Sequence, residues 1–386
     1  MVSESVPKKK IAIIGASYLQ LPLIQKVQEL GMEAHVFAWA SDDVGEKEAD
    51  YFYPISIVEK EQILKKCREI KVDGICSIAS DLAVGTINYV ADKMNLCANS
   101  MESTEISTNK AKMREAFWKH EDPSPKFLFV GHETPADDIQ LSDFSYPVIV
   151  KPVDRSGSRG VSLVMNRYEL NEAVERARRN GFLKDILVEE FAKGKEFSVE
   201  CISYKGTHTM LAITEKFTTE APHYIEVGHL EPADIDTELN NKIKNTVFHA
   251  LDTLKIQNGA SHTEIKILEG QIKIIEIGAR MGGDMIGSSL VPLSTGVDFV
   301  KAVIDIALGK EPNLKGMSPS KAAGIRFILT DDDIKAYTAI KAKYAASILE
   351  ENIPEEIEGE VSDSSERFGY YIFQGEKRDD LIPLLP

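Results

Sequence analysis

The N-terminal third alternates apolar runs with helical segments, and this alternation restricts the fold more than any other feature of the chain. The run KIAIIGA, residues 10–16, is continuously apolar and ends in glycine, as expected of a parallel strand buried on both faces. A helical stretch from Leu19 to Leu30 follows, then the run EAHVFAWA, and then a third helix–strand pair that ends in DGICSIA. Elements that alternate at this spacing predict a doubly wound α/β sheet.

The turn after the first predicted strand excludes a classical NAD site. It reads GASYLQLP and contains one glycine, Gly15, where a dinucleotide fingerprint needs three. The open sheet still offers a crevice at the carboxyl ends of its strands. Asp81, in SIASD, follows a strand at such an end. It either caps the next helix, which is the simpler interpretation, or faces a substrate.

Length and charge set the broad class of the protein. At 386 residues the chain is too long for one simple core and predicts two or three domains. The net charge of −16 disfavours nucleic acid or a membrane surface as the main partner, although a local basic cluster can still bind an anion. The four cysteines lack metal-ligand spacing and indicate free thiols in a reducing compartment. With no signal-peptide core and no apolar window long enough to span a membrane, the expected location is the cytoplasm.

The stretch KPVDRSGSRGVSLV, Lys151 to Val164, predicts a hairpin that binds phosphate. Lys151 ends a strand, SGSRG makes a turn, and VSLV returns, so this is no strand–helix P-loop. Backbone N–H groups of the small residues can donate to phosphate oxygens without side chains in the way. Lys151 would add a point charge. Taken alone, SGSRG is more often an ordinary turn and a strand-end lysine more often a solvated edge residue.

Neighbouring segments complete a lid-like lobe from Lys151 to Val199. A helix in YELNEAVERARRNG ends at Gly181, and two strands in ILVEEFAKGKEFSVECISY are joined at Lys193–Gly194. Before the lobe, residues 107–120 predict another helix, capped by one of its first three residues. A small lobe of this kind can close over a nucleotide and exclude water.

The last third supplies carboxylates for a metal ion. ASHTEIKILEGQIKIIEIGARMGGD predicts two strands around a turn at Glu269–Gly270, with Glu264 on one strand and Glu276 on the other. Two carboxylates near a triphosphate suit Mg²⁺, and Arg280 would hold a transferring phosphoryl group. The apolar pairing of this hairpin puts the two carboxylates on opposite faces. A β-bulge, or a Glu276 beyond the paired region, is needed to bring them together.

These elements together resemble the ATP-grasp superfamily, over roughly Lys10 to Lys310. Relatives include biotin carboxylase, D-alanine–D-alanine ligase and the L-amino-acid ligases. The resemblance implies an α/β chain that is α+β in its C-terminal part. The expected domains are an N-terminal α/β domain (1–108), an ATP-grasp domain (109–309) with a β-rich lid at about 122–200 and a central antiparallel sheet, and a β-rich C-terminal segment (310–386) packed on the central domain.

The resemblance also implies a role for each matching residue. Lys110 and Lys151 bind the nucleotide; Ser156, Gly157, Ser158 and Gly160 form the phosphate loop; Glu189 lies near the base; the backbone of Phe191 and Ala192 meets the ring edge; Glu196 binds the ribose; Glu264 and Glu276 hold Mg²⁺ or Mn²⁺; and Arg280 is catalytic. Many members carry Asn two residues after the second metal carboxylate, where this chain has Gly278. A water or Asp284 is the candidate replacement, and the number of metal ions stays open.

The implied activity is that of an ATP-dependent, ADP-forming carboxylate–amine ligase. It would act through an acyl phosphate on an amino acid or a similar small carboxylate. PHYIEVGHLEPA resembles a motif near the acceptor substrate, so His223, Glu226 and His229 are candidate substrate residues, or else ordinary loop residues. The alternatives are an ATP-binding regulatory protein without ligase chemistry and a ligase with a non-amino-acid acceptor. Partners would be small molecules, and many relatives are dimers, so a homodimer is one candidate assembly.

Overall fold

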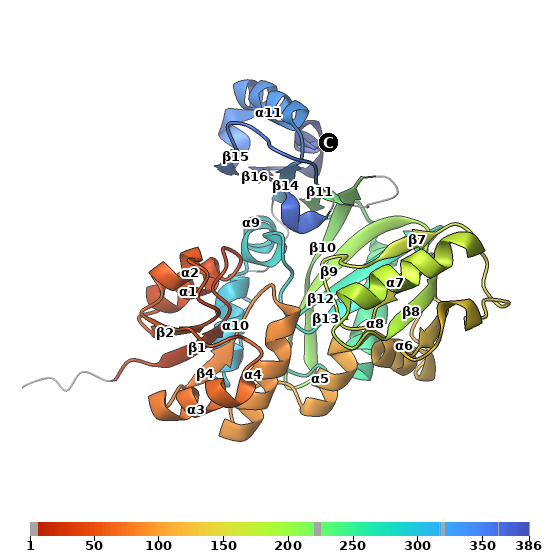
Figure 1. The fold of residues 1–386 in the computed structure, drawn as a ribbon. Coiled ribbons are helices and arrows are strands. Elements are labelled where there is room, and N and C mark those ends of the chain that lie inside the picture. The colour runs from red at the N-terminus through yellow and green to blue at the C-terminus, as the bar shows by residue number, and fades with distance from the viewer. Residues whose placement is uncertain (1–6, 220–224, 316, 318–320, 362, 386) are drawn as a thin grey trace, which may run out of the picture.

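Three β-sheets organise the protein, as the computed structural model shows (Figure 1). The structure describes residues 7–219, 225–315, 317, 321–361 and 363–385. One sheet is parallel and belongs to the N-terminal domain, one is a small antiparallel sheet, and one is a large antiparallel sheet of eight strands. The mixed α/β class predicted from the sequence is confirmed.

The N-terminal sheet has the strand order β3-β2-β1-β4, all parallel. Its strands are β1 (Lys10–Ile14), β2 (Glu33–Phe37), β3 (Tyr51–Tyr53) and β4 (Gly74–Cys76), and its helices are α1 (Leu21–Glu29), α2 (Val44–Glu48), α3 (Lys60–Ile70) and α4 (Asp81–Met94). The alternation of strand and helix is therefore confirmed. The short pair α2 and β3 was not predicted, because neither piece is long enough to show a period.

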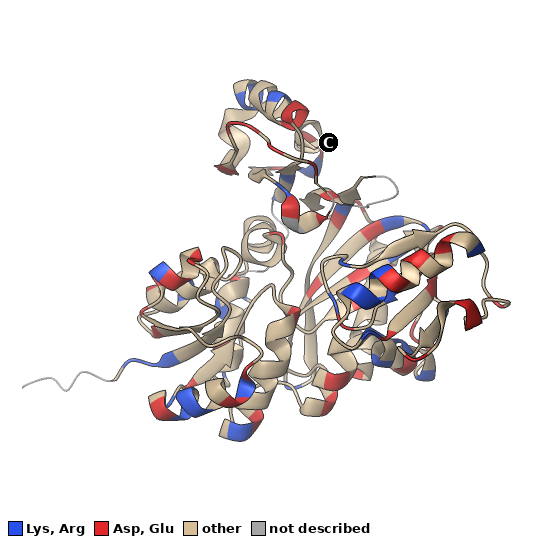
Figure 2. Ribbon diagram, in the orientation of Figure 1, with Lys and Arg blue, Asp and Glu red and all other residues tan. Residues whose placement is uncertain are grey.

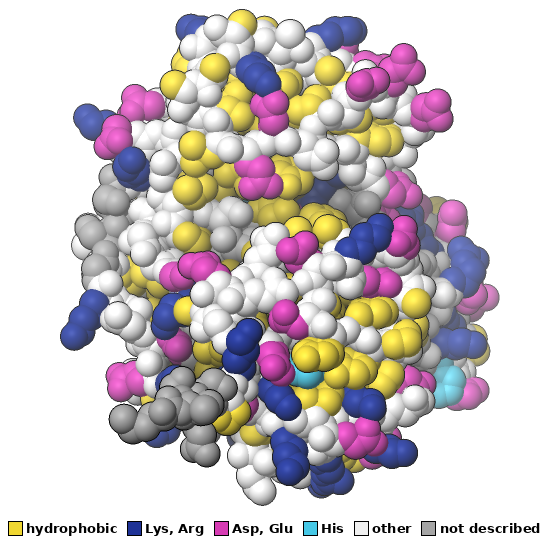
Figure 3. Space-filling view, turned by 90° about the vertical axis from the view of Figure 1, so that its left-hand side faces the viewer, with side chains coloured by type: hydrophobic (Ala, Val, Ile, Leu, Met, Phe, Trp, Pro, Cys, Tyr) yellow, Lys and Arg dark blue, Asp and Glu magenta, His cyan; other side chains and the backbone are white. Residues whose placement is uncertain are grey.

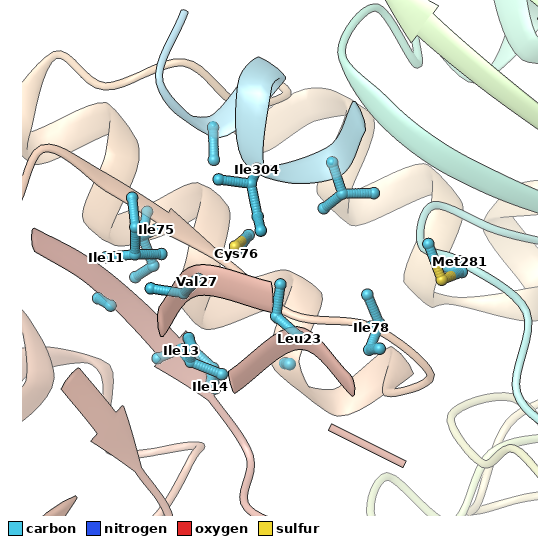
Figure 4. Packing of buried hydrophobic residues seen from close by; sticks show 14 of the residues in the cluster. Ile11, Ile13, Ile14, Leu23, Val27, Ile75, Cys76, Ile78, Met281 and Ile304 are labelled. Carbon is cyan, nitrogen blue, oxygen red and sulfur yellow. The ribbon is translucent and has the colours of Figure 1, made fainter. Parts of the chain in front are cut away.

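A helix from much later in the chain completes the N-terminal domain. Helix α10 (Phe299–Ala307) contributes buried side chains to the same apolar core as β1, α1 and β4. In Figure 4, Ile304 of α10 lies close to Ile75 and Cys76 of β4. The predicted boundary at residue 309 placed α10 in the ATP-grasp domain, and the helix shares its apolar core with both the N-terminal domain and strands β9 (Lys195–Tyr204) and β12 (Gly259–Leu268) of the large sheet.

The small sheet forms the lid, in the order β5-β8-β6-β7. Its strands are β5 (Phe127–Val130), β6 (Val148–Pro152), β7 (Ser162–Val164) and β8 (Ile186–Glu190), and helix α7 (Leu170–Asn180) packs against them and ends at Gly181. The β6–β7 hairpin around SGSRG is confirmed. The predicted end of the lid near residue 200 is wrong, because the lid sheet stops at Glu190 and the next strand belongs to the large sheet.

The large sheet has the order β13-β12-β9-β10-β11-β14-β16-β15. Its strands are β9 (Lys195–Tyr204), β10 (Thr207–Thr218), β11 (Glu226–Glu231), β12 (Gly259–Leu268), β13 (Gln271–Gly278), β14 (Ala322–Ile328), β15 (Ile348–Asn352) and β16 (Gly369–Gly375). Helices α6 (Lys110–Lys119) and α8 (Thr237–Thr253) bury one face of strands β9, β12 and β13. The opposite face of these strands is left for charged side chains.

The C-terminal segment extends the large sheet instead of lying on top of it. Strand β14 pairs with β11, and β16 and β15 follow at the sheet edge, covered by α11 (Asp331–Tyr344). Figure 3 shows the surface hollowed between this upper part and the parts below it. Shorter elements are α5 (Met101–Thr108), α9 (Val291–Thr295), a π-helical turn at Ile286–Leu290, and 3-10 turns at Ala136–Asp138, Arg167–Glu169, Ala345–Ser347, Ser364–Glu366, Arg378–Asp380 and Ile382–Leu384.

The β12–β13 hairpin contains a bulge, which is one of the two arrangements that the sequence left open for bringing the carboxylates together. Ile267 pairs with Ile272 and Ile265 with Ile274, as predicted, but Glu264 pairs with Glu276 because the register shifts between Glu264 and Ile265. Directly opposed residues of an antiparallel pair share a face. The bulge therefore brings both carboxylates to the face that α6 and α8 do not cover.

Charged residues of both signs lie along the solvent-facing helices (Figure 2). Acidic and basic side chains alternate along α7 and the other solvent-facing helices (Figure 2). None of the described helices combines the length and the apolar character needed to cross a membrane.

Candidate active site

A cavity of about 210 Å³ lies between the lid and the large sheet. The predicted site residues that line it are Asp81, Lys110, Lys151, Ser156, Gly157, Ser158, Glu189, Phe191, Ala192, Glu196, Glu226, Glu264, Glu276 and Arg280. They come from the N-terminal domain, from α6, from the lid and from four strands of the large sheet. The fold therefore gathers residues that are up to two hundred positions apart in the chain.

At the lid end of the cavity, Lys151 is held by a buried charge network. Its Nζ lies 2.7 Å from Glu189 Oε2, and both side chains are almost fully buried. Glu189 also accepts from Arg114 Nε at 2.8 Å. Burial lowers the pKa of Lys151, although Glu189 acts in the opposite direction. Glu189 was predicted to lie beside the base, and in this structure its carboxylate forms ion pairs with Lys151 and Arg114.

Arg114 is a residue that the sequence did not single out. It is 1% exposed, and besides Glu189 it donates through Nη2 to the carbonyl of Ile275 at 2.5 Å. Ile275 is the unpaired residue of the β12–β13 bulge. Arg114 thus links the lysine of the lid to the bulge of the metal hairpin. A lone arginine inside an amphipathic helix, KAKMREAFWK, gives no sequence signal of this role.

The phosphate loop is built by backbone conformation. Gly157 and Ser158 both have positive φ, at +65° and +56°, and together with Ser156 they line the cavity. Gly160 does not line the cavity, and a Cβ there would lie 2.7 Å from Asn180 Cβ on α7. The close approach to α7 therefore requires glycine at position 160, and the part of Gly160 in the phosphate loop stays a prediction.

Next along the cavity, the predicted ribose residue Glu196 lies among lysines. Lys216 Nζ is 3.1 Å from Glu196 Oε1, and Lys266 Nζ is 3.5 Å from its other oxygen. Lys266 Nζ also lies 5.4 Å from the ring centre of Phe191, which follows the lid strand β8. Phe191 and Ala192 line the wall of the cavity as the hinge segment was expected to do.

Each metal-binding candidate is paired with a lysine. Lys110 Nζ contacts Glu276, and Lys216 Nζ lies 3.1 Å from Glu264 Oε1. Although burial alone would raise it, Lys216 and His262 hold the pKa of Glu264 well below its usual value. Lys216 is almost completely buried, and despite desolvation its pKa is raised by Glu264, Glu196 and Glu226.

The donor set suits a hard divalent cation that shares its coordination with phosphate. Within the described ranges no cluster of three or more His, Cys, Asp or Glu side chains forms a complete metal cage. Glu264 and Glu276 stand on adjacent strands, facing the same cavity as the phosphate loop. Mg²⁺ usually binds through one or two carboxylates plus the oxygens of a substrate phosphate, so these residues fit it.

Arg280 is fixed by an aspartate from the other domain. Asp81 accepts a two-point contact from Arg280, with Nε and Nη2 each 2.9 Å from a carboxylate oxygen. Helix α4 begins at Asp81, and Ser80 precedes it as the N-cap residue, so the interpretation of Asp81 as a cap is wrong. Despite burial, Arg280 lowers the pKa of Asp81, and Asp81 raises the pKa of Arg280.

The same ion pair explains Gly278. A Cβ at this position would lie 3.0 Å from Asp81 Oδ1 and 3.1 Å from Arg280 Cζ. An asparagine here would have to displace the pair. Asp284, the other candidate replacement, binds Arg367 at 2.5 Å and His229 at 3.3 Å and does not line the cavity. The Asp81–Arg280 pair therefore occupies the space beside Gly278 that an asparagine side chain would need.

Comparison with known proteins gives a family match over the middle of the chain. Residues 144–288, which include the phosphate loop and the metal hairpin, match the ATP-grasp domain family. The chain therefore contains a region that is similar to the ATP-grasp domain. It is 27% identical over 305 residues to an alanine–anticapsin ligase of Bacillus subtilis (strain 168), covering 72% of this chain and 61% of that protein.

Two further proteins are similar to this chain. A D-alanine–D-alanine ligase of Marinomonas sp. (strain MWYL1) is 31% identical over 194 residues, covering 48% of this chain and 59% of that protein. The crystal structure of an L-amino acid ligase from Bacillus licheniformis superposes with a TM-score of 0.79 at 24% identity, covering 97% of this chain and 95% of that one, and supports the fold. The chain spans about three fifths of the length of the curated relatives it matches.

The cavity also contains a buried pair that sequence reasoning missed. His262 Nδ1 is hydrogen-bonded to Glu200, and His262 Nε2 lies 3.5 Å from Glu264 Oε1. Against the effect of burial, Glu200 raises the pKa of His262 to about 9. Its signal was present in the sequence: His262 precedes Glu264 by two residues, so both side chains lie on the same face of one strand.

The predicted acceptor residues that the structure describes, Glu226 and His229, lie in different environments. Glu226 lines the cavity, 3.5 Å from Lys216 Nζ, and contacts Ser364 of the C-terminal segment. His229 is completely buried, against Asp284 and the edge of Phe327, so direct contact with a substrate is not what this structure shows. Burial lowers the pKa of His229. His223 lies outside the described residues.

Proposed function

We propose that this ATP-grasp protein is an ATP-dependent, ADP-forming carboxylate–amine ligase whose substrate is an amino acid or a similar small carboxylate. One observation carries the proposal. A single cavity holds the lid lysine and phosphate loop, two opposed carboxylates on the β12–β13 bulge, and an arginine fixed by Asp81. Nucleotide binding alone would not need the arginine and both carboxylates at the phosphate end.

The chemical difficulty is that a carboxylate is a poor electrophile, since attack on it adds charge to an anion. In the proposed first step, a carboxylate oxygen of the substrate attacks the γ-phosphorus of ATP, the bond to the β-phosphate oxygen breaks, and ADP leaves. In the second step, an amine attacks the carbonyl carbon of the acyl phosphate, inorganic phosphate leaves, and the amine loses a proton.

The residues of the chain supply charge and position for these steps. Lys151, Ser156 and Ser158 bind the phosphates and hold the lid over them. Arg280, fixed by Asp81, takes up charge that develops on the transferring group. Glu264 and Glu276 would hold Mg²⁺ or Mn²⁺, which neutralises phosphate charge when it is bound. Lys110 pairs with Glu276 and Lys216 with Glu264 in this structure. Both lysines would contact the phosphates once the metal ion takes their carboxylate partners.

The proposal includes a cytoplasmic location, in line with four cysteines that form no disulfide, and a homodimer is the assembly to test first by sedimentation. The decisive experiment is a coupled assay of ADP release over pairs of amino acids and small amines. We expect ADP and phosphate to form only when both a carboxylate and an amine are supplied. AMP and pyrophosphate as products would exclude the acyl-phosphate route, and failure of ATP to bind would exclude the function.

A further inference from the structure

Glu200 is a buried charge below the site that the proposed chemistry does not use. It lies on β9, is completely buried, and does not line the cavity. Its carboxylate has two partners from separate segments, Nδ1 of His262 on β12 and the backbone N–H of Gly282, the latter at 3.0 Å. An ionised carboxylate is costly to bury unless such partners compensate for the lost water.

The first partner connects Glu200 with the metal-binding carboxylate. His262 stands opposite Glu200 on one side and Gly278 on the other in the strand register. Its Nδ1 is taken by Glu200, which leaves Nε2 pointing to Glu264 at 3.5 Å. A ring held at one nitrogen has one orientation, so Glu200 sets where the other nitrogen meets Glu264.

The second partner connects Glu200 with the catalytic arginine. Gly282 follows Arg280 by two residues, in the loop after β13. A Cβ on Gly282 would lie 2.8 Å from Glu200 Oε1 and 2.7 Å from His262 Nδ1. Only glycine lets the loop come this close, and the hydrogen bond to Glu200 fixes the loop at that distance.

We propose that Glu200 is the positioning residue of this active site, acting through His262 on Glu264 and through Gly282 on Arg280. One buried carboxylate would thereby set both the metal-binding group and the group that stabilises phosphoryl transfer. This inference rests on the proposed function, because it assigns Glu264 to the metal and Arg280 to the transferring phosphate.

The test measures metal binding directly. Mn²⁺ is titrated into the full chain with a non-hydrolysable ATP analogue present, and free Mn²⁺ is read by electron paramagnetic resonance. In Glu200→Gln the side chain keeps its shape, but it is neutral and one of its two acceptor oxygens becomes an NH₂ donor. It can therefore no longer accept from both His262 and Gly282. We expect Mn²⁺ affinity to fall on the order of 10–100-fold, the range for loss of a group that orients a metal ligand.

A matched control is available in the same sheet. Glu231 on β11 is also completely buried and also has two side-chain partners, Thr214 and Ser294, but none of its contacts reaches Glu264 or Arg280. Glu231→Gln should therefore bind Mn²⁺ with the wild-type affinity. Nucleotide binding without metal is measured by the thermal shift in the presence of a chelator. It should be the same in the wild-type protein, Glu200→Gln and Glu231→Gln.

Two variants of His262 test the path. His262→Asn keeps a donor for Glu200 but has no group that reaches Glu264. His262→Gln reaches towards Glu264 but loses the bond to Glu200. Both should weaken Mn²⁺ binding, and His262→Asn should keep the wild-type melting temperature more closely. If Glu200→Gln does not fold, His262→Asn carries the test.

The outcomes separate the inference from the proposed function. Wild-type Mn²⁺ affinity in folded Glu200→Gln or His262→Asn overturns the inference alone. An equal loss of affinity in Glu231→Gln also overturns it, because any disturbance of the sheet would then weaken the site. Absence of Mn²⁺–nucleotide binding in the wild-type protein would instead overturn the proposed function, and the inference with it.

Discussion

At the scale of single residues, the site depends on charges that hold one another in place. Arg280 is placed by Asp81, and the absence of a side chain at Gly278 leaves room for that pair. The pair also joins the N-terminal domain to the large sheet across the cavity. A two-point contact of this kind restricts the guanidinium plane as well as its position.

We therefore expect Arg280→Ala to lower turnover by on the order of 10²–10³-fold, the scale for removing one preorganised group that stabilises developing charge. Asp81→Asn should lower it less, because the arginine remains but loses its fixed orientation. Steady-state ADP release measures both. Arg326→Ala, which breaks an ion pair with Asp333 outside the cavity, is the control and should retain kcat. Wild-type turnover in Arg280→Ala would remove this residue from the mechanism.

At the scale of elements, the β12–β13 hairpin and the lid are connected through α6. Arg114 on α6 binds both Glu189, which holds Lys151, and the carbonyl of the bulge residue Ile275. Arg114→Met should destabilise the fold by about 3–5 kcal/mol, the cost of breaking a buried ion pair by removing one partner. Denaturant unfolding measures this. Adding Glu189→Gln should recover part of the loss, and an additive double variant would show that the two residues are not coupled.

The lid should also respond to nucleotide as a unit. Its phosphate loop, residues 156–160, has an exposed centre and few side-chain anchors, so its amides should exchange quickly without ligand. Mg-ATP should slow exchange in this loop while strands β9 and β12, which are buried in the large sheet, change little. Hydrogen exchange followed by mass spectrometry tests this, and equal exchange of the loop in both states would argue against closure.

At the scale of the whole molecule, a buried carboxyl ties the large sheet to the helices next to it. Glu231 accepts from Thr214 Oγ1 at 2.7 Å and is bonded to Ser294 of α9, and burial raises its pKa to about 7. The folded state therefore holds a proton on Glu231 that the unfolded chain releases near pH 4.5. This contribution to stability is complete below that pH and is lost as pH rises to about 7.

Glu231→Gln removes this titration because the amide is always neutral. Relative to the variant, the wild-type protein should lose stability between about pH 4.5 and 7, by about 1.4 kcal/mol for each unit by which the pKa is raised. Parallel urea unfolding at several pH values gives the difference in the free energy of unfolding. A difference that does not change with pH would show that Glu231 titrates normally.

The sequence by itself determined the elements and the residue types of the site. Periodicity predicted the N-terminal α/β sheet, the hairpin around SGSRG and the helix ending at Gly181, and it gave a bulge as one of two alternatives for the metal hairpin. These features show in the pattern of neighbouring residues along the chain. Pattern and order together also identified many of the residues that line the cavity, although not His262 or Lys266.

Only the tertiary structure decided which charges meet. Asp81 and Arg280 are 199 residues apart, Arg114 and Ile275 are 161 apart, and Glu200 and His262 come together only because β9 pairs with β12. It likewise decided that α10 covers the N-terminal sheet and that the C-terminal strands extend the large sheet. A local pattern carries no information about partners that chain folding brings from other domains, and buried charges are defined by those partners.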